Sequence, residues 1–334
     1  MNDLWAFNTI TMEWREINTS GSIPSSRSNC AMHFDEVQNR IIVFGGGGSN
    51  KKRFNSINVL DWHTKVWSEI LPKVDESAPW ERTYHTAEMF YPYLVVFGGE
   101  GVSDLDDLWI CNLEDNTWKE VPIPKGAVRP CARRFHASAR VGNQFFVIAG
   151  CHQKYRCLSD IYSIDLTPFL DGGRIDHLEW RERKMKESTF LTRWGHTATV
   201  HESKIYVFGG RFCNDLNDIL VLDPERDEVS TLKVSHEIPK ARRRHSACFL
   251  GSSMLIFGGF NGEYFNDLHY INVYSAKKRL TTLLAPTQTS IKQLSQVKGL
   301  QTEKIESKEG RSVLVFVELL QMRFIESDGM EEFL

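Results

Sequence analysis

Arginine and histidine recur together in this sequence at a fixed spacing. In four places an arginine is followed three residues later by a histidine, at Arg82 and His85, Arg133 and His136, Arg193 and His196, and Arg242 and His245. A variant copy has Arg27 followed by Cys30. A guanidinium group binds a carboxylate through two parallel hydrogen bonds and keeps its charge. The arginines are therefore candidates for contacts with carboxylates, within the fold or on a partner, and the histidines raise the question of a metal site.

The histidines are poorly placed for binding a metal ion. Zinc needs ligands that converge within about 2.0 to 2.3 Å of one ion, whereas these histidines recur once per repeat and are expected on separate strands. The only local group of soft ligands is Cys151, His152 and Cys157, whose spacing is not typical of a zinc site. We predict structural histidines, and no metal or other cofactor.

Each of these arginines stands at the start of a larger repeated unit. Five apolar runs end in a pair of small residues, at Gly45 and Gly46, Gly98 and Gly99, Ala149 and Gly150, Gly209 and Gly210, and Gly258 and Gly259. Successive pairs are 49 to 60 residues apart, which is enough for about four short strands with turns. Glycine allows positive φ and close packing where the strand ends. Large anchors such as Trp67 and Trp118 follow 20 to 22 residues later and can fill the space between neighbouring sheets.

These markers, kept in register, resemble kelch repeats. The shared features are the Arg-x-x-His start, the apolar strand into a glycine pair, an Asn-Asp-Leu-Trp-like third strand and the late tryptophan, and they extend over residues 1–280. The resemblance implies an all-β fold, a kelch β-propeller whose four-stranded sheets, or blades, surround a central channel.

The chain begins in the middle of a repeat, since residues 2–5 read as a third strand and Trp14 as its anchor. Kelch propellers close the ring by building one blade from both chain ends, so the degenerate apolar runs in 310–334 are expected to supply the missing strands. We predict six blades, five continuous and one composite; the alternative is that this tail lies outside the ring. The expected order is a half-blade at 1–20, blades at about 21–72, 73–124, 125–185, 186–235 and 236–284, a polar linker at 285–309, and the closing strands.

The resemblance also suggests where a partner binds. In kelch proteins that act as substrate receptors of ubiquitin ligases, arginines in the loops at one mouth of the channel hold acidic or C-terminal carboxylate groups of a peptide. Here those loops contain the Arg-x-x-His segments and the residues directly after the glycine pairs. The expected partner-binding residues are Arg82, Arg134, Arg193, Arg211, Arg243, Tyr84, Phe135, Trp194 and Phe260. The alternative for each arginine is that it braces the blades or faces solvent.

We therefore predict a protein-interaction module that binds a partner protein or peptide and is not an enzyme. The sharper hypothesis is a substrate receptor of a ubiquitin ligase; the alternatives are a cytoskeletal or trafficking scaffold and a metal-dependent kelch enzyme, either an oxidase or a specifier-like protein. No Glu-x3-Asp-x3-His string lies near a glycine-pair loop, and no Ser-His-Asp arrangement or phosphate-binding loop stands out.

Composition argues against two other classes of partner. The net charge of -3 gives no basic field for nucleic acid, and the local cluster 240–244 is expected to be a solvated loop. No apolar run approaches the roughly 20 residues of a membrane-spanning helix. Seven cysteines without a disulfide pattern, and no secretory signal, predict reduced thiols and a cytoplasmic protein, with the nucleus as the alternative location.

Overall fold

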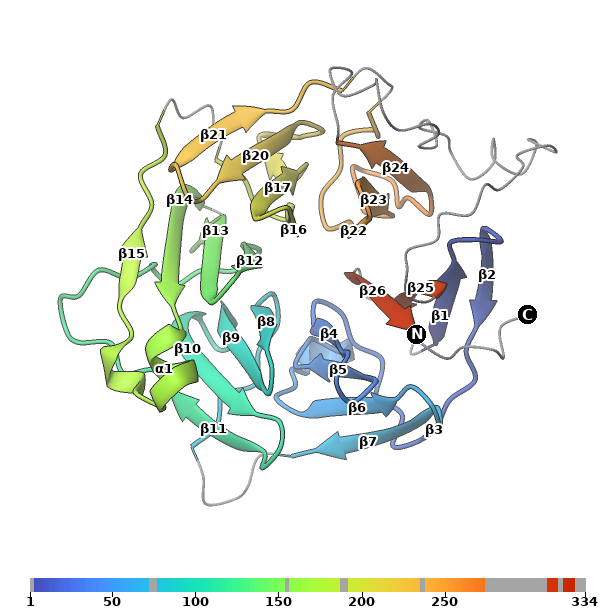
Figure 1. The fold of residues 1–334 in the computed structure, drawn as a ribbon, viewed down its shortest axis with the longest axis horizontal. Helices are drawn as coiled ribbons and strands as arrows, with labels where there is room; N and C mark the ends of the chain where they lie inside the picture. Colours follow the sequence, from blue (N-terminus) through green and yellow to red (C-terminus); the bar gives the residue numbers. More distant parts are fainter. Residues whose placement is uncertain are drawn as a thin grey trace.

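The computed structural model describes residues 3–71, 77–153, 156–186, 192–234, 238–273, 311–317 and 321–327, and the predicted linker at 285–309 lies outside them. The described part is almost entirely β-structure, and its sheets stand around a ring with their inner strands at a central channel (Figure 1). This confirms the predicted all-β propeller. No helix among these residues is long and apolar enough to cross a membrane.

Five sheets come from consecutive stretches of chain, and we number them as blades in chain order. The first contains β3 (Ser20–Gly21), β4 (Ala31–Asp35), β5 (Arg40–Phe44), β6 (Ile57–Asp61) and β7 (Val66–Ile70). The second contains β8 (Thr86–Phe90), β9 (Tyr93–Glu100), β10 (Asp104–Asn112) and β11 (Thr117–Glu120). The third contains β12 (Ala137–Val141), β13 (Gln144–His152), β14 (Arg156–Asp165) and β15 (Trp180–Glu182).

The fourth blade contains β16 (Thr197–His201), β17 (Lys204–Phe208), β20 (Ile219–Asp223) and β21 (Glu228–Thr231). A small ribbon, β18 (Arg211–Phe212) and β19 (Asn214–Asp215), projects between β17 and β20. The fifth blade contains β22 (Ser246–Leu250), β23 (Ser253–Phe257) and β24 (Leu268–Asn272).

A further sheet joins the two ends of the chain. Its order is β2 (Glu13–Glu16), β1 (Leu4–Asn8), β25 (Arg311–Val317) and β26 (Gln321–Ser327), with Leu4 opposite Val317. Figure 1 shows this sheet between the fifth blade and the first. The strands pair as in the predicted composite blade, so the C-terminal strands form part of the ring instead of lying outside it.

The predicted anchors fill the space between neighbouring blades. The Trp118 ring lies 5.2 Å from that of Phe44 in the first blade, and the Trp180 ring lies 5.3 Å from that of Phe97 in the second. The insertion before Trp180, expected to be a longer loop, forms the short helix α1 (Thr167–Gly172), whose buried Phe169 packs on Tyr93. Each anchor thus contacts the apolar strand that leads into a glycine pair.

A single pattern of contacts explains why the glycine pairs and the histidines keep a common register. A Cβ atom on Gly99, the second residue of its pair, would come 2.7 Å from the Cβ of His85 and 2.7 Å from the carbonyl oxygen of Thr83 in the same blade. A Cβ atom on Gly45, the first residue of its pair, would come 2.6 Å from Cε1 of His85 in the next blade. The pair therefore allows one histidine to be buried at each junction.

Replacing Gly99 with alanine should lower the free energy of unfolding by about 2 to 3 kcal/mol, because the new methyl group meets backbone atoms at a φ of +96°. The matched control is Gly142→Ala, in the turn between β12 and β13, where φ is +58° but no atom lies within 4 Å of the added Cβ. That variant should lose only about 1 kcal/mol. Urea unfolding of both variants measures the difference, and equal losses would contradict the steric explanation.

The seven cysteines are all free thiols. Cys30, Cys111, Cys151 and Cys248 are buried, as the strand-like sequence around them predicts, whereas Cys131 and Cys213 are exposed. Burial raises the pKa of the Cys30 thiol to about 11, so this group stays protonated and unreactive near neutral pH.

Candidate functional site

The first arginine of each Arg-x-x-His segment lies inside its blade. The side chains of Arg82, Arg133, Arg193 and Arg242 are 0 % exposed and bind Asp107, Asp160, Asp218 and Asp267 with two hydrogen bonds each, at 2.6 to 2.9 Å. Arg193 also donates to the carbonyl oxygen of Gly209 at 3.0 Å. Each arginine lies just before the first strand of its blade. Its side chain is thus bonded to the aspartate at the third strand, and that of Arg193 also to the end of the second strand.

Two predicted partner-binding residues are therefore corrected. Arg82 and Arg193 expose no surface at the mouth, because Asp107 and Asp218 hold them inside the blade. They match the alternative that the arginines brace the blades, although they act within one blade rather than between two. The aspartate that follows each arginine after 25 to 27 residues was the sequence signal for this pairing.

The third residue of each Arg-x-x-His segment lines the channel. In the second to fifth blades its N–H donates to the carbonyl of the equivalent residue in the preceding blade at 2.7 to 3.3 Å, and φ is +54° to +67° in all five blades. The residues of this inner ring are Asn29, Tyr84, Phe135, Gly195 and Arg244. One residue from each of five blades is therefore held at the same level of the channel.

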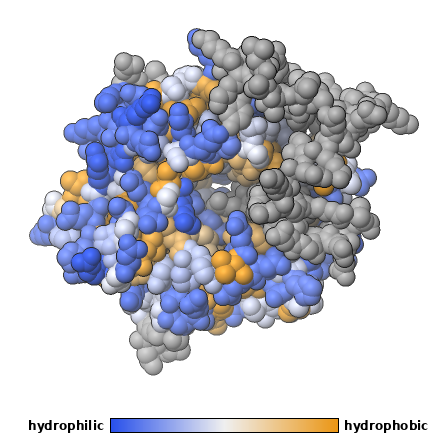
Figure 2. Space-filling view, viewed as in Figure 1, coloured by the Kyte–Doolittle hydropathy of each residue, from blue (hydrophilic) through white to orange (hydrophobic). Residues whose placement is uncertain are grey.

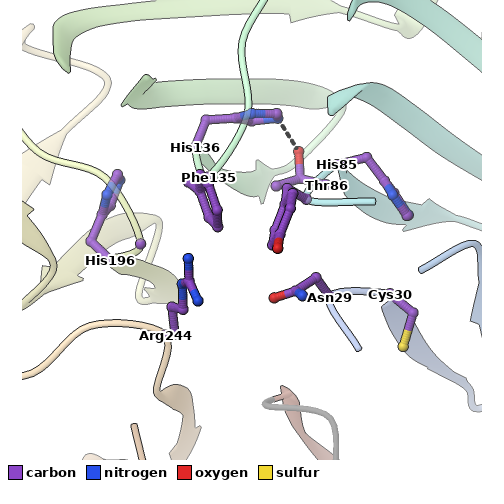
Figure 3. A pocket seen from close by; sticks show the side chains of 10 residues that line it. Asn29, Cys30, His85, Thr86, Phe135, His136, His196 and Arg244 are labelled. Atoms are coloured by element: carbon purple, nitrogen blue, oxygen red, sulfur yellow. Dashed lines mark hydrogen bonds between the residues drawn. The ribbon is translucent and has the colours of Figure 1, made fainter. Parts of the chain in front are cut away.

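Aromatic side chains from neighbouring blades form a continuous cluster, made of Tyr84 and Phe135 of the inner ring and of Trp194, which directly precedes the inner-ring residue Gly195. The ring centroids of Tyr84 and Phe135 are 4.0 Å apart, and Trp194 lies 5.1 Å beyond Phe135. This cluster borders a cavity of about 110 Å³. In Figure 3 the side chains of Asn29, Phe135 and Arg244 converge on this space, while those of His85 and His196 point away from it. Figure 2 shows the hollow at the centre of the ring, where apolar and polar residues meet.

Arg244 provides the positive charge of the cavity. Its guanidinium carbon lies 4.7 Å from the ring centroid of Phe135, 5.5 Å from that of Trp194 and 5.8 Å from that of Tyr84. In the part of the chain that the structure describes, Arg244 forms no ion pair, and its buried Nε has no hydrogen-bond partner. We expected a solvated loop here, but aromatic faces hold this cation beside the channel.

The other predicted arginines lie around this cavity and already contact carboxylates. Arg243 binds Asp215 at 2.5 and 2.7 Å, and Arg211 reaches the same carboxylate at 3.2 Å. Arg134 contacts Glu100 at 2.9 Å. Burial alone would lower the pKa of Arg134, but Asp104 and Glu100 raise it above its ordinary value. These carboxylates hold the arginines in fixed positions.

Phe260 completes the set, with its ring 4.8 Å from the guanidinium carbon of Arg243 and 4.9 Å from the ring of the exposed Tyr264. The structure thus brings together seven predicted residues, Tyr84, Phe135, Trp194, Arg134, Arg211, Arg243 and Phe260, which we call the mouth cluster together with Arg244. Sequence reasoning missed Arg244 and Asn29. The signal was the third position of each segment, which varies in type while the arginine two residues before it is constant and the residue after it is histidine in four of the five segments.

The histidines lie at the junctions between blades, where His85, His136 and His196 also line the cavity. His136 and His245 contact the hydroxyls of Thr86 and Thr197 in the preceding blade at 2.9 Å. Burial, together with the nearby Arg82 and Arg242, lowers the pKa of His85 and of His245 to about 3. Among the described residues, no three His, Cys, Asp or Glu side chains gather so as to hold a metal ion. The contacts support structural histidines.

Known proteins share these repeats along most of the chain. A sequence model of the KLHDC2/KLHL20/DRC7 Kelch-repeats domain matches residues 1–210 and 169–296. The acyl-CoA-binding domain-containing protein 4 of Arabidopsis thaliana is 27% identical over 324 residues, which are 92% of this chain and 46% of that protein.

Two further relatives match the chain over shorter stretches. The adagio-like protein 1 of Oryza sativa subsp. japonica is 32% identical over 252 residues, 72% of this chain and 35% of that protein. Host cell factor 2 of Homo sapiens is 27% identical over 270 residues, 75% of this chain and 32% of that protein. The chain spans less than half the length of these three relatives.

Proposed function

The chain belongs to the kelch-repeat family, whose propellers bind protein partners, and on this premise we propose that it captures a partner protein or peptide at its mouth cluster. The observation that carries the proposal is Arg244, a cation held by three aromatic rings beside a cavity and without a carboxylate partner among the described residues. Rigid blades hold these loop residues in place before a ligand arrives, which reduces the entropy lost on binding.

The charges of the mouth favour an acidic ligand, either an Asp or Glu side chain or a C-terminal carboxylate. Arg211 and Arg243 share the single carboxylate of Asp215. Arg134 shares Glu100 with Arg53, which lies 3.2 Å from that carboxylate. Together with the unpaired Arg244, the described cations therefore outnumber the carboxylates, and a ligand carboxylate would gain charge-assisted hydrogen bonds.

The aromatic cluster supplies the apolar part of the same surface. Tyr84, Phe135 and Trp194 offer ring faces from three blades, and such rigid side chains contribute contact area at little entropic cost. We propose a peptide segment that places an apolar side chain on these rings and a carboxylate on Arg244.

We further propose that this binding serves recognition rather than catalysis, and that the protein delivers its partner to a ubiquitin ligase as a substrate receptor. Support for the ligase role comes from the family resemblance and from the arginine-lined mouth. Affinity purification from cells tests this step separately, because a receptor should co-purify with cullin-adaptor subunits while a cytoskeletal or trafficking scaffold should not.

Replacing Arg244 with alanine should weaken binding of a selected acidic peptide about 10-fold or more, because a charge-assisted contact contributes about 1.5 to 3 kcal/mol. A peptide screen on the purified chain would first select the ligand, and fluorescence anisotropy would then measure its Kd. Each ligand should be compared with its C-terminal amide and with a copy carrying Asn or Gln for its acidic residues.

The matched control is Arg226→Ala, in the turn between β20 and β21, where the side chain is 71% exposed. This variant removes the same charge and should leave the Kd unchanged. Equal binding by wild type and Arg244→Ala would contradict the proposed mouth.

A further inference from the structure

The arginine–aspartate pair that braces each blade is incomplete in the first blade. Gly209 donates its N–H to the carbonyl of Asp218 at 3.2 Å, and Gly45 donates in the same way to Ser56 at 3.3 Å. Ser56 therefore occupies the position that an aspartate fills in the other four continuous blades. Its hydroxyl is directed to Asn58, 3.5 Å away, rather than to an arginine.

Arg27 occupies the position of the bracing arginine but has no aspartate. Its Nε donates to the carbonyl of Ser25 at 3.1 Å and its Nη1 to that of Gly45 at 3.2 Å, as Arg82 donates to the carbonyls of Trp80 and Gly98. It is only 5% exposed, and it forms no ion pair within the described residues. Its guanidinium carbon lies 4.0 Å from the ring centroid of Phe54.

The missing carboxylate leaves the buried positive charge of Arg27 energetically unfavourable, and this is visible in its pKa. Burial lowers the pKa of its guanidinium below the ordinary value, opposed by Cys30 and Glu69. A buried cation without a partner is unfavourable, and a bound anion would offset that cost.

A pocket opens at this position. Its volume is about 470 Å³, and Arg27, Phe54, Ser56 and Asn58 are among the residues that line it. This is within the usual size range of ligand sites, roughly 300 to 1,000 Å³, so it has room for more than the carboxylate alone.

The charges around the pocket are balanced. Its charged lining residues are Arg27, Lys52 and Arg53 against Glu69 and Glu81, and Arg53 is paired with Glu100 of the second blade. The preference for an anionic ligand therefore comes from Arg27 itself, which is buried and forms no ion pair within the described residues.

We propose that this pocket binds a peptide carboxylate, which takes on Arg27 the place that an aspartate side chain takes in the other four blades. In those blades the aspartate oxygens receive two hydrogen bonds at 2.6 to 2.9 Å, so a carboxylate fits the guanidinium in both charge and shape. The carboxylate comes from an Asp or Glu side chain or from a chain end. This site is separate from the mouth cluster and stands whether or not the mouth binds a ligand.

Ser56→Asp is the decisive variant, because it supplies the missing carboxylate from within the chain. The variant should fold and melt about 2 °C or more above wild type, since one added charge-assisted pair exceeds about 1 kcal/mol. It should also bind peptide carboxylates at least 10-fold more weakly. Ser203→Asp, at an exposed position in the turn between β16 and β17, adds the same charge away from the pocket; it is the matched control and should bind as wild type does.

The probes are three acetylated glycine-rich peptides of equal length: one with a free C-terminus, one amidated with an internal Asp, and one amidated and neutral. Ligand-detected NMR on the full chain measures their binding. The first two distinguish a chain end from an acidic side chain, and the neutral peptide should not bind. Arg27→Met should abolish binding while circular dichroism shows the fold retained.

Three results would overturn the proposal. The first is equal carboxylate binding by wild type and Ser56→Asp. The second is equal binding of the neutral peptide. The third is loss of binding in Arg244→Ala but not in Ser56→Asp, which would place the carboxylate in the mouth cluster instead.

Discussion

Replacing Asp218 with alanine should lower the free energy of unfolding by about 3 to 5 kcal/mol. Arg193 is 0 % exposed, and both of its terminal nitrogens donate to Asp218, at 2.9 and 2.8 Å. Removal of the aspartate leaves a buried guanidinium without the carboxylate that both of its terminal nitrogens contact. Urea unfolding followed by circular dichroism measures the loss.

Two companion variants separate charge from volume. Asp171→Ala, at an exposed position in α1, should change the stability by less than about 0.5 kcal/mol. The double variant Arg193→Met/Asp218→Leu should recover much of the loss, because replacement of both charges by apolar groups leaves no unpaired ion. A cost below 1 kcal/mol for Asp218→Ala alone would show that the pair does not brace the blade.

Lowering the pH from 7 to 5 should destabilise the protein strongly. The pKa of His85 and of His245 is about 3 in the folded state, because burial and a nearby arginine oppose protonation, against an ordinary value of 6.5. The unfolded chain therefore takes up protons that the folded chain does not, and stability falls as the pH falls from about 6.5 toward 3. At pH 5 each of these two histidines costs about 2 kcal/mol.

His136 and His196 act in the same direction, since burial lowers the pKa of both well below 6.5. Urea midpoints at pH 7, 6 and 5 should decrease, and His245→Asn should reduce the slope by about one proton. A midpoint that stays constant between pH 7 and 5 would contradict this account.

The fold could be predicted from the sequence because several marker residues recur in register, and each of them is required by a particular packing contact. Gly99 has no side chain and so leaves room for the backbone at His85, and Trp118 fills the space beside Phe44. The closing strands β25 and β26 could be located without a glycine pair, since an open propeller would leave β1 unpaired on one side.

The site was harder to predict because adjacent residues of one segment have opposite environments. Arg133 is enclosed in its blade while Arg134 faces the mouth, and spacing alone does not distinguish them. The direction of Arg244 depends on a positive φ, a conformation that a non-glycine residue seldom adopts. Asp215, which orients Arg211 and Arg243, comes from a loop ribbon that the repeat pattern does not contain.

The composite blade sets the order of events during synthesis. Leu4 pairs with Val317, so β1 has to wait for β25 before the ring can close. At about 5 to 20 residues per second, translation of the intervening segment takes roughly 15 to 60 seconds. Until β25 and β26 have left the ribosome, the nascent chain is an open arc that exposes the flanks of β1 and of the fifth blade, and this is when chaperones should matter most.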